Sequence, residues 1–337
     1  MPRSEHMRAM VLTANSSIHT RPLRFAAFPD PEPGPGEVLI RVGACAACRT
    51  DLQICEGDVR ARMLPVIPGH QVAGRIEAVG EGVDDWSEGD RAGLTWLAGT
   101  CGRCAFCLSG RENLCEHATF TGWDRHGGFA ELVSARADVV VPLPEGPADR
   151  DLAPLLCGGV IGFRALRVAG IRPDARVGLF GFGASALQAI QVARHMGCRI
   201  AVATRSDAER QRALSLGAEW AGGYDEPPPF PLDLVVTFAP SGDVVAHAVR
   251  ALDRGGTVAI NAIHLDRLPE MSYADLWWER SIRSVANVTR QDARDYLELA
   301  AAIPVVTAVE EHALPDANRA LQRIATGEVE GAAVVIP

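Results

Sequence analysis

Two patterns of apolar and polar positions divide the chain. Over the first 150 residues, short runs rich in β-branched residues, such as EVLIRVG and ELVSARADVVVPLP, alternate with turn sequences rich in Gly and Pro, such as PGPGE. Short strands that are separated by turns are typical of a β-rich domain. We therefore expect the chain to begin with such a domain.

From about residue 160 the pattern changes to alternating strands and helices. The apolar run RVGLFGF predicts a strand, and the next segment, ASALQAIQVARHMG, predicts a helix because Ala186, Ile190 and Ala193 share one face and Gly197 can end it. CRIAVATR and SDAERQRALSLGA repeat this order. Strands that alternate with helices of this length predict a parallel sheet with right-handed crossovers.

After about residue 293 the pattern is mixed again, and it ends in the apolar run AAVVIP. We expect this tail to return to the first domain. The fold class is therefore α/β, with a β-rich domain over residues 1–158 and 293–337 and an inserted parallel-sheet domain over residues 159–292.

Composition and charge exclude several classes of partner. The chain has 337 residues, of which 47% are apolar and 22% charged, as in ordinary globular proteins. A net charge of −9 argues against nucleic acid and anionic membranes as partners, since both prefer a basic face. We find no signal peptide or membrane span, so the nine cysteines are interpreted as metal ligands and free thiols, and a cytoplasmic location is expected.

A glycine-rich turn predicts a dinucleotide site. Gly181, Gly183 and Ala186 form the pattern G-x-G-x-x-A between a predicted strand and a predicted helix. The first Gly allows a tight turn, the second lets the backbone approach a pyrophosphate, and a small third residue lets the helix pack on the sheet. Ala184 and Ser185 open the helix, whose N-terminus favours phosphate charge.

The end of the next strand bears on which nucleotide binds. An NAD site usually has an acidic residue there for the ribose 2′-hydroxyl, but this chain has Thr204, Arg205 and Ser206. Arg205 can pair with a 2′-phosphate, so we favour NADP over NAD. The alternative is that Arg205 is an ordinary surface residue and that Asp207 does the work of the acid.

Four cysteines in one short loop predict a closed metal site. Cys101, Cys104, Cys107 and Cys115 have the spacing C-x2-C-x2-C-x7-C within residues 98–118. Four thiolates around Zn²⁺ form a tetrahedral site that has no open position. We expect this zinc to hold the loop in shape.

A catalytic zinc needs three protein ligands and an open position. The candidates are Cys48 in ACAACRTDLQ, His70 in VIPGHQVAG and Cys157 in APLLCGGVIG. Each of them alone is weak evidence, because a single His after a Pro-Gly turn is more often a structural or surface residue.

Taken together, these motifs resemble the zinc-dependent medium-chain alcohol dehydrogenases over essentially the whole chain. CRTD, PGHQVAGRIEAVGEGV, the four-cysteine loop, LCGG and the glycine-rich turn occur in the order of that family. The resemblance implies a GroES-like catalytic domain, a Rossmann domain, about two zinc ions per chain and a cofactor that is NADP or NAD. It implies that Cys48, His70 and Cys157 hold the catalytic zinc.

The resemblance also implies roles for neighbouring residues. Thr50 would pass the substrate proton, Asp51 would orient the ring of His70, and Arg49 would contact the pyrophosphate, because the last strand lacks the arginine of many relatives. Asp51 could instead be a turn-capping carboxylate. Two departures are Gln53, where many relatives have a proton-relaying His, and Gln71, where many have Glu.

Trp96 and Trp123 flank the cysteine loop, and the resemblance implies that they line a pocket for small or medium apolar alcohols; core packing is the alternative. The expected activity is oxidation of primary or secondary alcohols, or reduction of the matching aldehydes and ketones. A specialised NADPH-dependent carbonyl reductase is the close alternative, and a non-catalytic protein that binds nucleotide and zinc is a third. The expected partners are a small alcohol or aldehyde and further copies of the chain, as a dimer or tetramer.

Overall fold

The computed structural model describes residues 6–263, 265–303 and 305–337. The chain divides into two compact units. The β-rich unit contains the residues up to Cys157, Asn287–Glu298 and the residues from Val306 onward, and the parallel-sheet unit contains Gly158–Ala286 and Leu299–Val305. The domain limits expected from the sequence stay a prediction; these units instead divide helix α9 (Arg290–Ala302) between them.

A mainly antiparallel sheet is the centre of the β-rich unit. Its strands follow the order β16-β17-β3-β4-β5-β9, and β8 also pairs with β3. Their bounds are β3 Glu37–Ala47, β4 Gln71–Val79, β5 Arg91–Leu94, β8 Leu132–Arg136, β9 Val141–Pro142, β16 Val309–Ala313 and β17 Ala332–Ile336. Strand β17 pairs with β3, with Val335 opposite Cys45, so the last strand of the chain belongs to this sheet.

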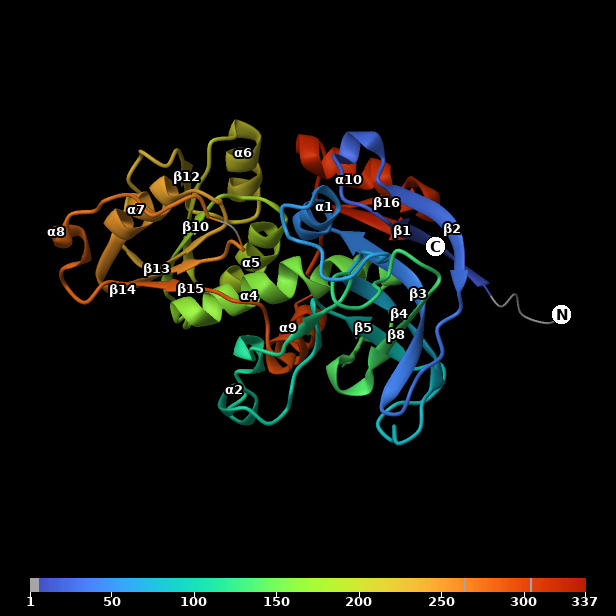
Figure 1. Ribbon diagram of the computed structural model, residues 1–337. Coiled ribbons are helices and arrows are strands. Elements are labelled where there is room, and N and C mark those ends of the chain that lie inside the picture. Colours follow the sequence, from blue (N-terminus) through green and yellow to red (C-terminus); the bar gives the residue numbers. More distant parts are fainter. Residues whose placement is uncertain (1–5, 264, 304) are drawn as a thin grey trace. The chain divides into compact units, whose positions relative to one another are not determined.

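Smaller elements surround this sheet. They are the paired strands β1 (His6–Leu12) and β2 (Leu23–Pro29), the paired strands β6 (Leu97–Gly99) and β7 (Thr119–Phe120), the helices α1 (Arg49–Glu56), α2 (Ala105–Leu108), α3 (Asp149–Leu152) and α10 (Ala317–Thr326), and the 3₁₀ turns η1 (Ile18–Thr20), η2 (Glu112–Leu114), η3 (Ala137–Val139), η4 (Ala153–Leu156) and η5 (Leu314–Asp316). Figure 1 shows α10 beside α1, although they lie near opposite ends of the chain. Buried residues of α10, Ala320 and Leu321, belong to the same apolar core as Ile54 of α1.

The parallel-sheet unit has the strand order β12-β11-β10-β13-β14-β15, and every pair within it is parallel. The strands are β10 Arg176–Phe180, β11 Arg199–Ala203, β12 Trp220–Gly222, β13 Leu232–Thr237, β14 Leu252–Ile260 and β15 Ser281–Ser284. From β10 the chain first adds strands on one side and then, from β13, on the other. The topological switch therefore lies between β10 and β13, where open α/β sheets bind ligands at the carboxyl ends of their strands.

Helices α4 (Gly158–Ala169), α5 (Ala184–His195), α6 (Asp207–Ser215) and α7 (Gly242–Ala251), with the short α8 (Tyr273–Leu276), complete this unit (Figure 1). Helix α4 packs on α5 at Gly162, where an added Cβ would lie 2.9 Å from the carbonyl oxygen of Ser185. A larger residue at position 162 would push the two helices apart. The mixed α/β fold class expected from the sequence is confirmed.

One stretch of the described residues, Asp149–Ala169, is long and apolar enough to cross a membrane by length and composition, and 61% of an 18-residue segment within it is buried inside the protein. It consists of α3, η4 and α4, with Cys157 between the last two. A mostly buried stretch of this kind is what a core helix of a soluble protein also presents.

Candidate active site and nucleotide site

Three residues that are distant in the sequence meet beside the central sheet of the β-rich unit. Cys48 follows β3, His70 directly precedes β4, and Cys157 follows η4. The β3–β4 pairing places Ala46 opposite Gln71, which brings the first two together, and Cys48 Sγ lies 3.4 Å from His70 Nε2. The three ligand atoms all lie within 4.8 Å of one another.

Asp51 orients the His70 ring and anchors the backbone beside Cys48 and His70. Its Oδ1 accepts hydrogen bonds from Nδ1–H of His70 at 2.9 Å and from the backbone N–H of Gly69 at 3.1 Å, and its Oδ2 accepts from the backbone N–H of Cys48 at 2.9 Å. Asp51 and His70 are 0% and 1% exposed. Because Nδ1 carries the proton in this arrangement, Nε2 of His70 presents a lone pair toward Cys48, as a metal-ligating histidine requires.

The electrostatics of the trio fit a bound cation. Burial alone would lower the pKa of His70, but the charges of Asp51 and Cys48 outweigh it and raise that pKa well above its usual range. The pKa of the Cys48 thiol is also raised, because it shares a hydrogen bond with Cys157 and because burial disfavours a thiolate. A divalent cation would reverse these shifts, and two sulfurs with one imidazole nitrogen are a donor set suited to Zn²⁺.

The neighbouring residues singled out in the sequence lie on the same elements. Thr50 is buried in the first turn of α1, and its N–H donates to Cys48 Sγ at 3.3 Å. Gln71 is buried, and its Nε2 donates to the carbonyl of Ala46 at 3.1 Å. Gln53 is half-buried one turn further along α1, whereas Arg49 is exposed at the start of that helix.

An aromatic stack borders the trio. The ring of Trp96 lies edge-on to His70 at 4.9 Å and stacks on Phe120 and Trp123 at 5.1 and 5.8 Å, between ring centroids. Trp123 Nε1–H donates to the carbonyl of Arg60 at 2.9 Å, and the Arg62 guanidinium lies 4.0 Å from the centroid of its ring. Arg62 could not be predicted from the sequence, because a cation–π contact leaves no regular spacing.

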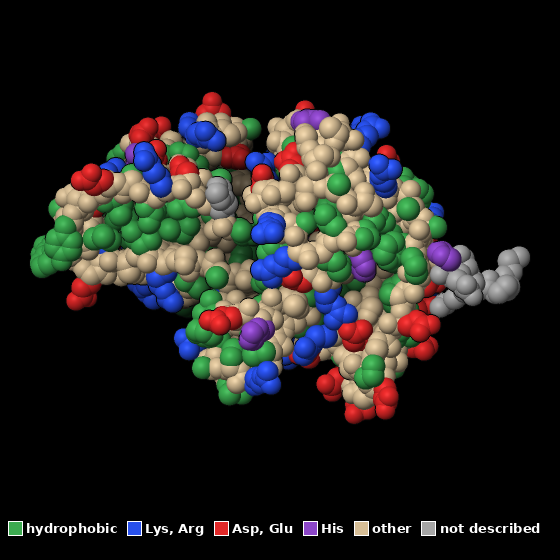
Figure 2. All heavy atoms as spheres, in the orientation of Figure 1, with side chains coloured by type: hydrophobic (Ala, Val, Ile, Leu, Met, Phe, Trp, Pro, Cys, Tyr) green, Lys and Arg blue, Asp and Glu red, His purple; other side chains and the backbone are tan. Residues whose placement is uncertain are grey.

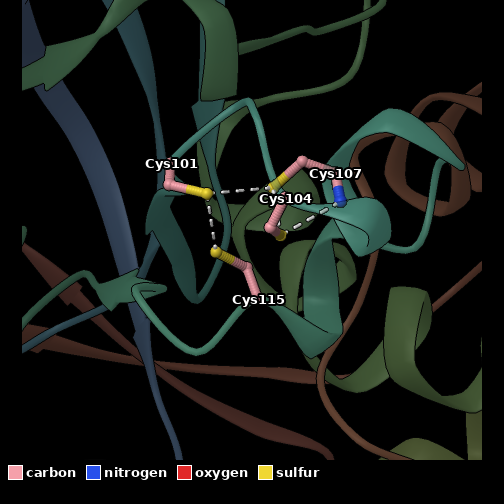
Figure 3. Close-up of side chains that lie close together, drawn as sticks. All are labelled: Cys101, Cys104, Cys107 and Cys115. Carbon is pink, nitrogen blue, oxygen red and sulfur yellow. Dashed lines mark hydrogen bonds between the residues drawn. The ribbon is translucent and has the colours of Figure 1, made fainter.

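The four-cysteine loop forms a second cluster in the same unit. The sulfurs of Cys101, Cys104, Cys107 and Cys115 point toward one another (Figure 3), and all lie within 4.8 Å of one another. Backbone N–H groups of Arg103 and Cys104 donate to Cys101 and lower its pKa to about 6. Four sulfurs in a closed ring fit a tetrahedral Zn²⁺ and leave it no position for substrate.

In the parallel-sheet unit, the glycine-rich turn joins β10 to α5 at the topological switch. Gly181 has a φ of +89°, and an added Cβ there would lie 2.8 Å from the N atom of Ala239, so the turn requires Gly. Gly183 is the exposed N-cap of α5 and has no side-chain capping bond; no described atom lies within 4 Å of a Cβ added there. Ala184 and Ser185 form the open first turn, and Ala186 is buried.

An acidic side chain, Glu209, lies at the end of β11, where the sequence predicted none. Thr204 is buried, Arg205 is exposed, and Ser206 caps α6 by accepting the N–H of Glu209 at 3.3 Å. This cap turns the Glu209 side chain back, and its carboxylate accepts a hydrogen bond from the Thr204 hydroxyl. Asp207, the alternative considered from the sequence, pairs with Arg210 and is highly exposed. The capping-box spacing Ser-x-x-Glu was the signal that could have revealed Glu209.

Comparisons with known proteins agree with this geometry. Residues 34–145 match the alcohol dehydrogenase GroES-like domain, and residues 186–302 match the zinc-binding dehydrogenase domain. The chain is 43% identical over 336 residues to a probable alcohol dehydrogenase, AdhA, of Mycobacterium tuberculosis, with 98% of this chain and 97% of that protein covered. It is 32% identical over 326 residues to an alcohol dehydrogenase of Geobacillus stearothermophilus, with 94% and 96% covered.

A solved structure is also closely similar over the full length. The cobalt- and zinc-bound thermostable alcohol dehydrogenase of Pyrobaculum aerophilum superposes with a TM-score of 0.88 at 26% identity, covering 98% of this chain and 100% of that one. The chain is therefore an oxidoreductase that acts on CH–OH groups, with zinc and a nicotinamide nucleotide as the cofactors of its family, and it belongs to the zinc-dependent medium-chain alcohol dehydrogenases.

Proposed function

We propose that this protein transfers hydride between a primary or secondary alcohol and NADP, in preference to NAD, at a zinc held by Cys48, His70 and Cys157. The observation that carries the proposal is the convergence of these three ligand atoms, within 4.8 Å of one another, around an imidazole oriented by the buried Asp51. Three ligands leave a zinc ion one position for substrate.

The residues around the trio have distinct parts in this chemistry. When bound, zinc would supply a Lewis acid that lowers the pKa of a substrate hydroxyl or polarises a carbonyl. The hydroxyl of Thr50, which follows the ligand Cys48 by two residues, would take the substrate proton. Trp96, packed edge-on against His70, would exclude water and shape the pocket, with Trp123 stacked behind it.

Proton release is proposed to run without a side-chain base at position 53. The amide of Gln53 cannot accept a proton near neutral pH, so water and the nucleotide ribose would carry the proton away from Thr50. Gln71 is neutral and already donates to Ala46. We therefore expect no side-chain carboxylate from position 71 to exchange onto the zinc.

The nucleotide is proposed to bind at the carboxyl ends of β10 and β11. The open first turn of α5, formed by Gly183, Ala184 and Ser185, would hold the pyrophosphate through backbone N–H groups. The tight turn at Gly181 and the buried Ala186 would bring that helix close to the sheet. Arg205 would pair with the 2′-phosphate of NADP.

Two further contacts belong to this nucleotide proposal. The exposed Arg49 would add a positive charge for the pyrophosphate, and Thr204 and Ser206 would border the adenosine ribose. The four-cysteine loop is proposed to hold a second zinc, which stabilises the fold and takes no part in hydride transfer.

We further propose a cytoplasmic homo-oligomer, a dimer or tetramer, formed through the parallel-sheet unit. Strand β15 is an edge of the six-stranded sheet, and the segment before it exposes Tyr273, Trp277 and Trp278. Figure 2 shows hydrophobic side chains gathered on one face of this unit, over the region of β14 and α8. An open edge strand beside exposed aromatic rings is a surface that a second copy of the chain can cover.

Consumption of reduced nicotinamide tests this proposal. NADPH and NADH are supplied separately with short aliphatic, branched and aromatic aldehydes, and oxidation of the matching alcohols is followed in the reverse direction. We expect turnover that a zinc chelator abolishes, faster with NADPH than with NADH. Turnover limited to one aldehyde would favour a specialised carbonyl reductase, and zinc-loaded protein without turnover on any substrate would contradict the proposal.

A further inference from the structure

The carboxyl end of β11 holds a cluster of side chains that the nucleotide proposal does not fully use. The backbone N–H of Thr204 donates to the carbonyl of Gly222 at 2.9 Å, and the Thr204 side chain is 3% exposed. Its hydroxyl donates to the carboxylate of Glu209. A negative charge is therefore fixed one hydrogen bond from the strand end where a nucleotide ribose binds in doubly wound folds.

Helix α6 holds this carboxylate in place. Ser206 Oγ accepts the N–H of Glu209 at 3.3 Å, so the first turn of the helix fixes the position of the Glu209 backbone. The next residue, Arg210, donates from Nε to the carbonyl of Thr204 at 2.9 Å and from a terminal nitrogen to Asp207 at 2.9 Å. Arg210 is therefore already paired, and it does not form an ion pair with Glu209 among the described contacts.

The pKa of the Tyr224 hydroxyl reflects the charges around this cluster. Burial raises the pKa of its hydroxyl, the charge of Arg205 lowers it, the charge of Glu209 raises it, and Thr204 shares a hydrogen bond with it. Arg205 and Glu209 thus act on the same small region with opposite signs. The cation would attract a 2′-phosphate there, and the carboxylate would repel it.

We propose that Glu209 is a specificity-determining residue that opposes Arg205 and limits the preference for NADP. Its carboxylate disfavours a 2′-phosphate and is a suitable acceptor for a ribose 2′-hydroxyl, which is the part an acidic residue plays in NAD sites. The inference rests on the nucleotide site proposed above. It predicts an enzyme that uses both nucleotides, with a smaller NADPH preference than Arg205 alone would produce.

The test compares Glu209→Gln with the wild type. Glutamine keeps the backbone N–H that Ser206 accepts and offers a neutral oxygen to Thr204, so the local fold is retained. The control is Glu219→Gln, which removes the same charge from a carboxylate paired with Arg199 at the amino end of β11. Thermal unfolding of both variants checks that neither has lost its fold.

The probes are AMP and adenosine 2′,5′-bisphosphate, titrated calorimetrically, so that the readout does not depend on turnover. We expect Glu209→Gln to bind the bisphosphate about tenfold more tightly relative to AMP, because one negative charge near a 2′-phosphate is removed. The NADPH-to-NADH ratio of kcat/KM should rise in parallel. Glu219→Gln should change neither ratio.

Two results would overturn the inference, and they are distinguishable. Unchanged ratios in Glu209→Gln, with a ratio that falls in Arg205→Ala, would remove Glu209 from nucleotide selection and leave the proposed site in place. Wild-type protein that binds neither AMP nor the bisphosphate would overturn the nucleotide site itself, and with it the role of Glu209.

Discussion

Asp51 Oδ1 lies 2.9 Å from His70 Nδ1, and both side chains are almost fully buried. The same carboxylate also accepts the backbone N–H groups of Cys48 and Gly69. One side chain therefore orients an imidazole and anchors the backbone beside two proposed metal ligands. Asp51 makes both contacts that were alternatives from the sequence, the cap at the start of α1 and the hydrogen bond to the His70 ring.

Asp51→Asn is expected to weaken zinc binding at the trio by about 10- to 100-fold, because the amide holds the His70 ring and its tautomer less firmly. The measurement is zinc removal by a competing chelator, followed through the loss of alcohol oxidation. Asp58→Asn, an exposed site shortly after α1, is the matched control and should behave as the wild type does. Equal zinc affinity in Asp51→Asn and wild type would contradict the orienting role.

Cys107→Ser is expected to remove the zinc proposed for the four-cysteine loop. Tm should fall by about 5 °C or more, because the loop then loses the metal ion that links its four cysteines. Binding of NADH should be retained because the nucleotide site lies on other elements. Zinc content, Tm and NADH titration are measured together. Cys198→Ser, a half-buried cysteine of the parallel-sheet unit, is the control; a Tm loss of the same size in both would argue against a structural zinc in this loop.

Trp123→Ala is expected to extend the range of substrates to bulkier aldehydes. Trp123 stacks on Trp96 and Phe120, and Arg62 covers its ring, so its removal opens the stack that borders His70. We expect kcat/KM for a bulky aromatic aldehyde, relative to propionaldehyde, to rise about tenfold.

The control for this prediction is Trp86→Ala, which removes another partly buried tryptophan of the same core, one that donates to the carbonyl of Ala137. It should lower stability without changing the aldehyde ratio. If both variants left the ratio unchanged, Trp123 would be a packing residue, the alternative that the sequence left open.

The stability of the fold is expected to fall below neutral pH through His126. Its Nδ1 accepts the backbone N–H of Ile67 at 3.2 Å, and burial, aided by the charge of Arg125, lowers its pKa below the usual value. Because the folded protein favours the neutral ring, this contribution is fully present above the unfolded pKa of about 6.5 and is lost as pH falls through the lower folded value.

Tm measured at pH 8 and pH 5.5 tests this expectation. The fall in Tm should be smaller in His126→Gln, whose amide oxygen can accept from Ile67 at either pH, than in the wild type. His19→Gln, at an exposed histidine, should follow the wild type. Equal falls in all three proteins would exclude His126 as the cause.

The fold and the four-cysteine cluster could be predicted because they follow from local patterns. Alternating strands and helices predicted the parallel sheet, and closely spaced cysteines predicted the cluster of Cys101, Cys104, Cys107 and Cys115. Cys48, His70 and Cys157 have no such spacing; their meeting depends on β3 pairing with β4 and on the turn after η4. Only the resemblance to a family could bring those three together in advance.

The carboxylate of Glu209 at the carboxyl end of β11 was not predicted from the linear sequence. Sequence position suggested that no acid faces the ribose, because Thr204 and Arg205 stand where the acid is usual. The first turn of α6 brings the Glu209 carboxylate back to Thr204. Side chains that return from a neighbouring helix turn depend on rotamers and caps. The contact of Arg62 with the Trp123 ring, which comes from an irregular segment between α1 and β4, also leaves no regular spacing in the sequence.

We propose that Cys48, His70 and Cys157 hold the zinc at which hydride transfer takes place. The most direct test is zinc content and alcohol oxidation measured on the same samples of wild type and Cys157→Ser. We expect about two zinc ions per wild-type chain and about one in the variant, with turnover lost and NADPH binding kept. Unchanged zinc content, or turnover that survives the loss of one zinc, would contradict it.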